Sequence, residues 1–223
     1  MKADKDVIDI CAYFENYQSK YNYVFVETDD KNGIIKKMNP HISALTKAIR
    51  GLNNEQFEKV SAIICQCLGF GDFHAATPSK KDEGIDFIAF RDNSLLKIDN
   101  KEYVVGQSKH FIELEIGTKE IRELSGSVLL FSRKEFSTSR DKYSEFKLGA
   151  FSPVHVLFIA NYFFSREAIK LCKATSIIPL DIIDIIGICI QGINEGIVNW
   201  LDTNGKIDIT RIEKDIDDVI ITS

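Results

Sequence analysis

Polar residues interrupt two apolar segments of the chain. Asp86 lies within the apolar segment 84–90, and Gln107 and Lys109 lie in the alternating segment 102–111. An acidic side chain in a buried strand is costly unless a hydrogen-bond donor or a cation compensates it. If the two segments pair as antiparallel strands, Asp86 faces Gln107 and Lys109 across the pair. A carboxylate, an amide and an ammonium group brought together in this way suit the binding of a divalent cation and the hydrolysis of a phosphodiester.

Three strands are expected to carry these residues, over 70–77, 84–90 and 102–111. In the third, Gln107 and Lys109 alternate with Ser108 and His110, so the two pairs face opposite sides of the strand. Cys65 and Cys67 are predicted to be core residues. No histidine has ligand-like spacing.

An amphipathic helix is predicted between the cap Asn53 and Gly69, because its apolar residues recur at helical spacing. A shorter helix over 43–50 precedes it, and Gly51 is expected to stop that helix with a positive φ. A short helix and a strand over 23–27 come earlier. After the strands, the pattern predicts a helix from Thr118, a strand over 153–160, a helix capped by Ser165, a strand over 176–180 and a helix over 181–200. The order indicates a three-layer α/β core, αβββαβ with further elements, around a mixed central sheet flanked by helices.

The composition indicates a globular chain. Of 223 residues 44% are hydrophobic and 27% charged, and the formal net charge is −5. Five scattered cysteines, without zinc-ligand spacing or a secretory signal, favour a reducing cytoplasm, and no apolar run is long enough for a membrane span. The acidic balance argues against tight, autonomous binding of nucleic acid. We expect a small N-terminal appendage (1–50), a core (51–200) and an acidic C-terminal tail (201–223).

These segments, in this order, resemble the catalytic domain of Mrr-type restriction endonucleases, the QxK branch of the PD-(D/E)xK nuclease superfamily. The resemblance covers roughly residues 50–185. It rests on Phe57-Glu58-Lys59-Val60 through Leu68-Gly69-Phe70, Asp82-Glu83-Gly84-Ile85-Asp86, Tyr103-Val104-Val105-Gly106-Gln107-Ser108-Lys109, Ile116-Gly117 with Ile121–Gly126, His155–Ala160 and Phe164–Ala168. Glu83 departs from the pattern, which commonly has a second glycine there.

The resemblance and the chemistry together imply a metal site. Asp86 would be the metal carboxylate, with the Gln107 side-chain oxygen and the Ser108 backbone carbonyl as neutral ligands for Mg²⁺, or for Mn²⁺ as a substitute. Lys109 would orient the attacking water and stabilise negative charge. By resemblance, Glu58 is the helix glutamate that approaches this site and restores part of the charge lost with the glutamine.

The function implied is a Mg²⁺-dependent DNA endonuclease of prokaryotic restriction or antiviral defence. A homodimer would supply the two cuts that two strands need. The stretch 119–147, with seven basic and five acidic residues, is a candidate surface for the phosphate backbone. The alternative function is a catalytically inactive or partner-dependent subunit that docks on a recognition protein. RNA as the substrate also stays open.

Ordinary structural roles compete with the catalytic ones. Glu58 follows Phe57 on an amphipathic helix and would usually be a solvated residue. Lys109 could instead be a strand-edge lysine that blocks aggregation. Asp86 could instead cap a turn.

Overall fold

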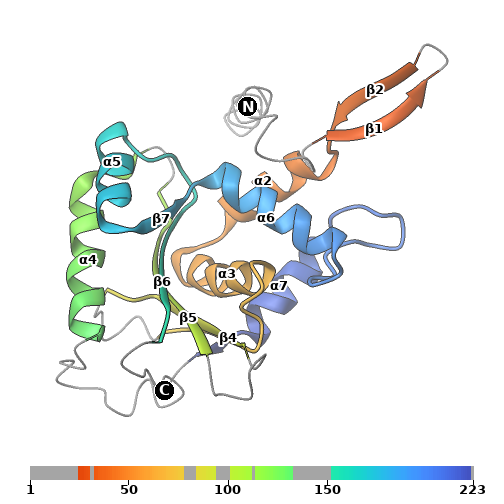
Figure 1. Ribbon diagram of the computed structural model, residues 1–223. Helices are drawn as coiled ribbons and strands as arrows, with labels where there is room; N and C mark the ends of the chain where they lie inside the picture. The colour runs from red at the N-terminus through yellow and green to blue at the C-terminus, as the bar shows by residue number, and fades with distance from the viewer. Residues whose placement is uncertain are drawn as a thin grey trace.

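The computed structural model describes residues 25–30, 33–77, 84–93, 101–111, 114–132 and 152–221, with side chains from residue 39 onward. In these ranges a six-stranded sheet lies between two layers of helices (Figure 1). The predicted three-layer α/β core is confirmed.

The sheet is mixed, as predicted, and its strand order is β7-β6-β5-β4-β3-β8. Strands β3, β4 and β5 pair antiparallel, β5, β6 and β7 pair parallel, and β8 is parallel to β3. The bounds are β3 (Phe73–Ala76), β4 (Phe87–Asp92), β5 (Lys101–Lys109), β6 (Val154–Ala160), β7 (Ile177–Leu180) and β8 (Ile220–Ile221).

Alternating side chains send each strand's apolar residues to two separate cores. On one side, which we call the α3 face, Ala89, Val104 and Ile159 pack beneath α2 (His41–Gly51), α3 (Asn54–Cys67), α6 (Ile182–Asn194) and α7 (Ile209–Asp218). On the other side, the α4 face, Ile88 and Val105 pack beneath α4 (Thr118–Ser132), which lies beside α5 (Arg166–Thr175). Figure 1 shows these two helical layers on opposite sides of the sheet.

Helix α3 begins and ends as its sequence predicts. The Asn53 side chain accepts a hydrogen bond from the Gln56 N–H (2.9 Å), and the Gln56 side chain accepts one from the Asn53 N–H (3.0 Å). This reciprocal arrangement satisfies two donors at the helix start. Gly69 follows the helix with a φ of +90°, in the region that favours glycine.

Two predicted helix ends were wrong. Gly51 is the last residue of α2 and has no positive φ, and the helix is followed by Leu52, whose backbone is extended. Helix α6 ends at Asn194 instead of Trp200, because Gly196 adopts a φ of +71° and the Gly192 carbonyl accepts the Ile197 N–H. A glycine in this conformation reverses the chain and closes the helix.

The segment 201–221 differs from the acidic tail expected from its charge. Its helix α7 buries Ile212 and Ile216 in the core, four residues apart, and leaves acidic side chains on its outer face. The indole N–H of Trp200 donates to the Asp215 carboxylate (2.8 Å). Helix α2, from the expected N-terminal appendage, also contributes to this core. The boundaries expected at 50 and 200 therefore fall within continuous packing.

Strands β1 (Phe25–Asp30) and β2 (Gly33–Met38) form a separate antiparallel hairpin, which extends away from α2 in Figure 1. The predicted strand at 23–27 lies partly within it, and the predicted helix before it lies outside the described residues. The described cysteines are free and buried: Cys65, Cys67, Cys172 and Cys189. Within the described ranges, no helix is both long and apolar enough to cross a membrane.

Candidate active site

The pairing of β4 with β5 brings Asp86 beside the polar end of β5. The strands are antiparallel with Phe87 opposite Gly106, and the Asp86 N–H donates to the Gly106 carbonyl at 2.8 Å. One residue further out, this register sets Asp86 opposite Gln107, as the sequence predicts.

The carboxylate of Asp86 is fixed by the next strand. Its Oδ2 accepts hydrogen bonds from the Ser108 backbone N–H (2.8 Å) and the Ser108 hydroxyl (3.4 Å). Both donors favour the ionised carboxylate. Asp86 is half-buried, so a charged group is held at a defined position at the end of the sheet.

Gln107 carries an unpaired acceptor next to this carboxylate. The residue is 3% exposed, and its Oε1 has no hydrogen-bond partner among the described residues. Leaving a buried acceptor unsatisfied costs about 1–3 kcal/mol. Such a group in a folded protein calls for a specific explanation, and a bound cation or water is one.

Gly84 lets helix α4 approach the amide closely. Its φ is +73°, and a Cβ added there would lie 2.3 Å from the Ser127 Oγ and 3.9 Å from the Gln107 Nε2. Both the conformation and the lack of space require glycine at this position. The turn before β4 therefore packs against Ser127 of α4 and lies near the Gln107 amide.

Lys109 is the last residue of β5. It shares the strand face of Gln107 by alternation, and its partner across the parallel ladder is Ala160, which packs on the α4 face. The Lys109 carbonyl accepts the Asn161 N–H at 3.3 Å. The structure thus brings Asp86, Gln107 and Lys109 to one end of the sheet, together with the Ser108 backbone.

Glu58 lies in the second turn of α3, next to Phe57. The Phe57 ring contacts the His110 ring, with 5.3 Å between centroids, so this part of α3 lies over the same end of β5. A catalytic role for Glu58 stays a prediction.

Two residues at this end carry unpaired polar atoms that the sequence did not single out as functional. His110 Nε2 and Asn161 Oδ1 are buried without a hydrogen-bond partner in the described structure. Burial lowers the pKa of His110, and hydrogen bonds to the backbone of Arg50 and Ile49 oppose this shift. The sequence signal for Asn161 is a polar residue directly after an apolar strand.

Carboxylates and imidazoles do not gather at this site. Among the described residues, no group of three or more His, Cys, Asp and Glu side chains is placed to hold a metal. A cation bound here would depend on amide and carbonyl oxygens besides Asp86, and Mg²⁺ accepts such ligands and retains several waters.

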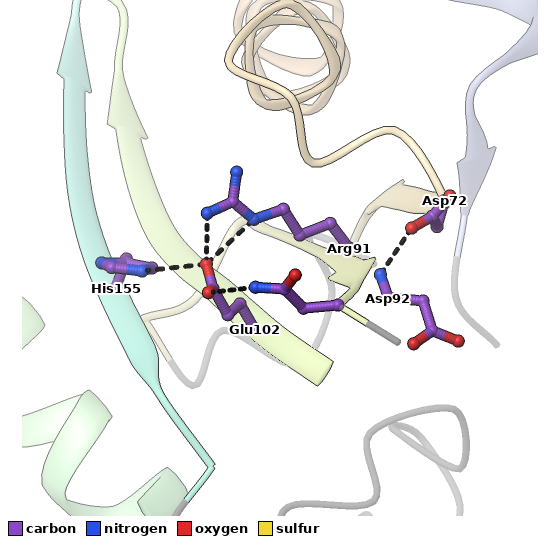
Figure 2. Close-up of polar contacts among 6 residues, drawn as sticks. Asp72, Arg91, Asp92, Glu102 and His155 are labelled. Atoms are coloured by element: carbon purple, nitrogen blue, oxygen red, sulfur yellow. Dashed lines mark hydrogen bonds and ion pairs between the residues drawn. The ribbon is translucent and has the colours of Figure 1, made fainter. Parts of the chain in front are cut away.

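The opposite end of the same strands holds a polar cluster of a different kind (Figure 2). Arg91 donates from Nε (2.9 Å) and Nη2 (2.5 Å) to Glu102 Oε2, and Asn93 donates to Glu102 Oε1 (2.9 Å). His155 Nε2 lies 3.8 Å from the same Oε2. These contacts tie the end of β4 to the starts of β5 and β6.

The Glu102 carboxylate is stabilised in its charged form. Hydrogen bonding from Arg91 is the largest cause that lowers its pKa, helped by Asn93 and by the nearby His155. The Arg91 guanidinium also lies over the Phe70 ring, 5.0 Å from the centroid. Every polar side chain of this cluster has a partner, which is typical of a structural brace.

Part of the chain matches a known protein family. Residues 49–139 match the family model Mrr_cat, described as a restriction endonuclease. The range contains Asp86, Gln107 and Lys109, and the match confirms the resemblance seen in the sequence motifs. No curated protein sequence matches this chain.

Two solved restriction endonucleases are similar to this chain. The MspJI restriction endonuclease in complex with a 27-mer oligonucleotide is similar with a TM-score of 0.54 and 13% identity, over 81% of this chain and 37% of that one. The DNA modification-dependent restriction endonuclease AspBHI gives a TM-score of 0.49 and 16% identity, over 84% and 46% of the two chains. This chain therefore spans about a third of the length of MspJI and just under half of that of AspBHI.

Proposed function

We propose that this chain, whose residues 49–139 match the Mrr-type restriction endonuclease domain, is a Mg²⁺-dependent DNA endonuclease of prokaryotic, cytoplasmic restriction or antiviral defence. The observation that carries the proposal is the Asp86 carboxylate, fixed by Ser108 beside the buried, unpaired Oε1 of Gln107. DNA as the substrate is supported by the class of the matching family.

The donor set fits a hard cation. Mg²⁺ prefers oxygen ligands, and Asp86 and Gln107 offer a carboxylate and an amide oxygen that lacks a partner among the described residues. We expect the Ser108 carbonyl to be a third ligand and Mn²⁺ to substitute. A set with one strand carboxylate binds the cation weakly, and Glu58 would strengthen it by adding negative charge.

The residues divide the chemistry between them. A bound divalent cation would supply electrophilic stabilisation of the phosphate and lower the pKa of a nearby water. Lys109, on the strand face of Gln107, orients the attacking water and stabilises the negative charge that develops on the phosphate. Asp86 is held in place because Ser108 donates to it twice.

A nicking assay tests the proposal. Supercoiled plasmid is incubated with Mg²⁺ and wild-type protein, Asp86→Ala, Lys109→Ala or the matched control Lys101→Ala, which changes the first residue of the same strand. We expect the first two variants to lose nicking and Lys101→Ala to retain it. Equal nicking by all four proteins would remove the proposed site.

A partner-dependent or inactive subunit is the second candidate. The net charge of −5 and the lack of a carboxylate cluster among the described residues favour it. Titration calorimetry with Mg²⁺ and Mn²⁺ separates the two functions. Binding that Asp86→Ala abolishes supports the enzyme, and no binding by the wild type supports the subunit.

We also propose that double-strand cleavage requires a homodimer, because each chain offers one site and a twofold dimer presents two. Light scattering during cleavage tests this. A monomer that forms linear product in one step would contradict it.

A further inference from the structure

Two of the unpaired polar atoms at the end of the sheet that carries Asp86 and Lys109 belong to His110 and Asn161. With Gln107 Oε1, they are the buried side-chain atoms of the described residues that have no hydrogen-bond partner. Gln107 belongs to the proposed metal site. The other two atoms lack such an explanation, and buried polar groups are rarely left unpaired in folded proteins.

The strand register sets these two residues side by side. Lys109 pairs with Ala160 in the parallel ladder, and the Asn161 N–H donates to the Lys109 carbonyl at 3.3 Å. The ladder ends at this pair, and His110 and Asn161 are the next residues of the two parallel segments. Neighbouring strands lie about 4.8 Å apart, so the two side chains start within hydrogen-bonding reach of a single small group.

Both side chains lie on the α3 face. The His110 ring contacts Phe57 of α3 at 5.3 Å. Ala160 packs on the α4 face, so strand alternation directs Asn161, which is 1% exposed, to the α3 face.

The chemistry of the two atoms is the same. Hydrogen bonding to the backbone of Ile49 and Arg50 acts on the His110 ring, and we assign it to Nδ1 because Nε2 has no partner among the described residues. With the proton on Nδ1, Nε2 is an acceptor, as is the Asn161 Oδ1. Two neighbouring acceptors cannot satisfy each other, but one water molecule has two hydrogens to donate.

We propose that His110 and Asn161 are positioning residues that share one bridging hydrogen-bond donor, a water molecule, and thereby hold the end of β5 that carries Lys109. This inference rests on the proposed nuclease function for the role of Lys109. The pair lies on the strand face opposite the Lys109 side chain. It reinforces the 3.3 Å bond that joins this end of β5 to the residue after β6.

A double-mutant cycle in thermal unfolding tests the pair without any need for activity. The variants are His110→Leu, Asn161→Leu and the double variant. Each single change breaks the same bridge, so we expect each to lower Tm by about 3 °C and the double variant to lower it by about the same amount. The control is a second cycle that combines Asn161→Leu with His155→Leu. The His155 ring packs on Phe70 on the same face, with 5.6 Å between ring centroids.

The control pair is expected to be additive, because His155 lies beside Glu102, 3.8 Å away, at the other end of the sheet. Additive losses for His110→Leu and Asn161→Leu would overturn the proposal. Non-additive losses would support the proposal even if the wild-type protein cleaved no DNA. A lack of cleavage would overturn only the proposed nuclease function.

Kinetics test the positioning role. We expect Asn161→Leu and His110→Leu to lower kcat about tenfold with little change in KM, because the lysine is displaced while the DNA-binding surface is unchanged. His110→Gln keeps a polar group near the Nε2 position and should restore most of kcat. A kcat unchanged in both leucine variants, or no recovery in His110→Gln, would contradict the role.

Discussion

The two ends of the β4–β5–β6 sheet satisfy their polar groups in opposite ways. At one end, which we call the closed end, Arg91 and Asn93 donate hydrogen bonds to Glu102, and His155 lies 3.8 Å from the same carboxylate (Figure 2). At the other, the open end, the side chains are Asp86, Gln107, Lys109, His110 and Asn161. Three of these have a buried polar atom without a partner among the described residues.

Apolar packing does not explain the difference. Helix α3 has a Phe–His ring contact near each end, Phe57 with His110 at 5.3 Å and Phe70 with His155 at 5.6 Å. The rings pack alike, and only the polar partners differ. We infer that the closed end stabilises the strands, whereas the open end keeps the Gln107 acceptor for a ligand at a cost in stability.

The largest expected effect separates the ends by activity. Asp86→Asn should lower the rate of DNA cleavage by about 10³-fold, because an amide binds the cation more weakly than a carboxylate, and the cation stabilises the charge that develops on the phosphate. Glu102→Gln, the matched acid-to-amide change at the closed end, should leave the rate within about threefold. Single-turnover cleavage measures both. Similar losses in the two variants would mean that the ends do not differ in function.

A second effect concerns the narrow packing beneath the open end. Gly106→Ala would place a Cβ 2.2 Å from Phe87 Cζ and 2.5 Å from the Leu157 carbonyl oxygen. We expect a loss of about 3 kcal/mol in the free energy of unfolding, measured by urea denaturation. The control Gly51→Ala, with no atom within 4 Å of the added group, should not destabilise the protein. A tolerated Gly106→Ala would contradict the strand packing described.

The smallest effect is the acid dependence of the closed end. Arg91 lowers the pKa of Glu102 in the folded protein, so the stabilisation is complete above the ordinary carboxyl value of 4.5 and is lost as the pH falls through the lowered pKa. The pair is partly exposed, and Glu102→Gln should cost about 1 kcal/mol at neutral pH. Urea denaturation from pH 7 to pH 3 should show the two proteins converging. A difference that is constant with pH would refute this.

Sequence reasoning predicted the elements better than their ends. The period of apolar residues and the Asn53 cap defined α3, because these are local features. The end of α6 depends on the positive φ of Gly196, and the sequence alone does not show which glycines adopt a positive φ. The segment expected to be a tail contains an amphipathic helix. Its many acidic residues drew attention to its charge and away from the two isoleucines that it buries.

The candidate site was predicted in part, for a similar reason. Asp86 and Gln107 stand out because they interrupt apolar strands. Asn161 gave a weaker signal, since its importance depends on the parallel register that sets it beside His110. Register between strands distant in the chain is a tertiary property. The closed end was missed because Arg91, Asn93 and Glu102 look like ordinary charged and polar strand ends.

Replacing Gln107 by leucine tests most directly whether the open end keeps an unpaired acceptor for a cation. The measurement is the Tm of wild type and Gln107→Leu, each with EDTA and with excess Mg²⁺. We predict that the variant is at least as stable as wild type in EDTA, because a buried unsatisfied acceptor is gone, and that Mg²⁺ no longer raises its Tm. A variant that is less stable in EDTA and still stabilised by Mg²⁺ would contradict the account.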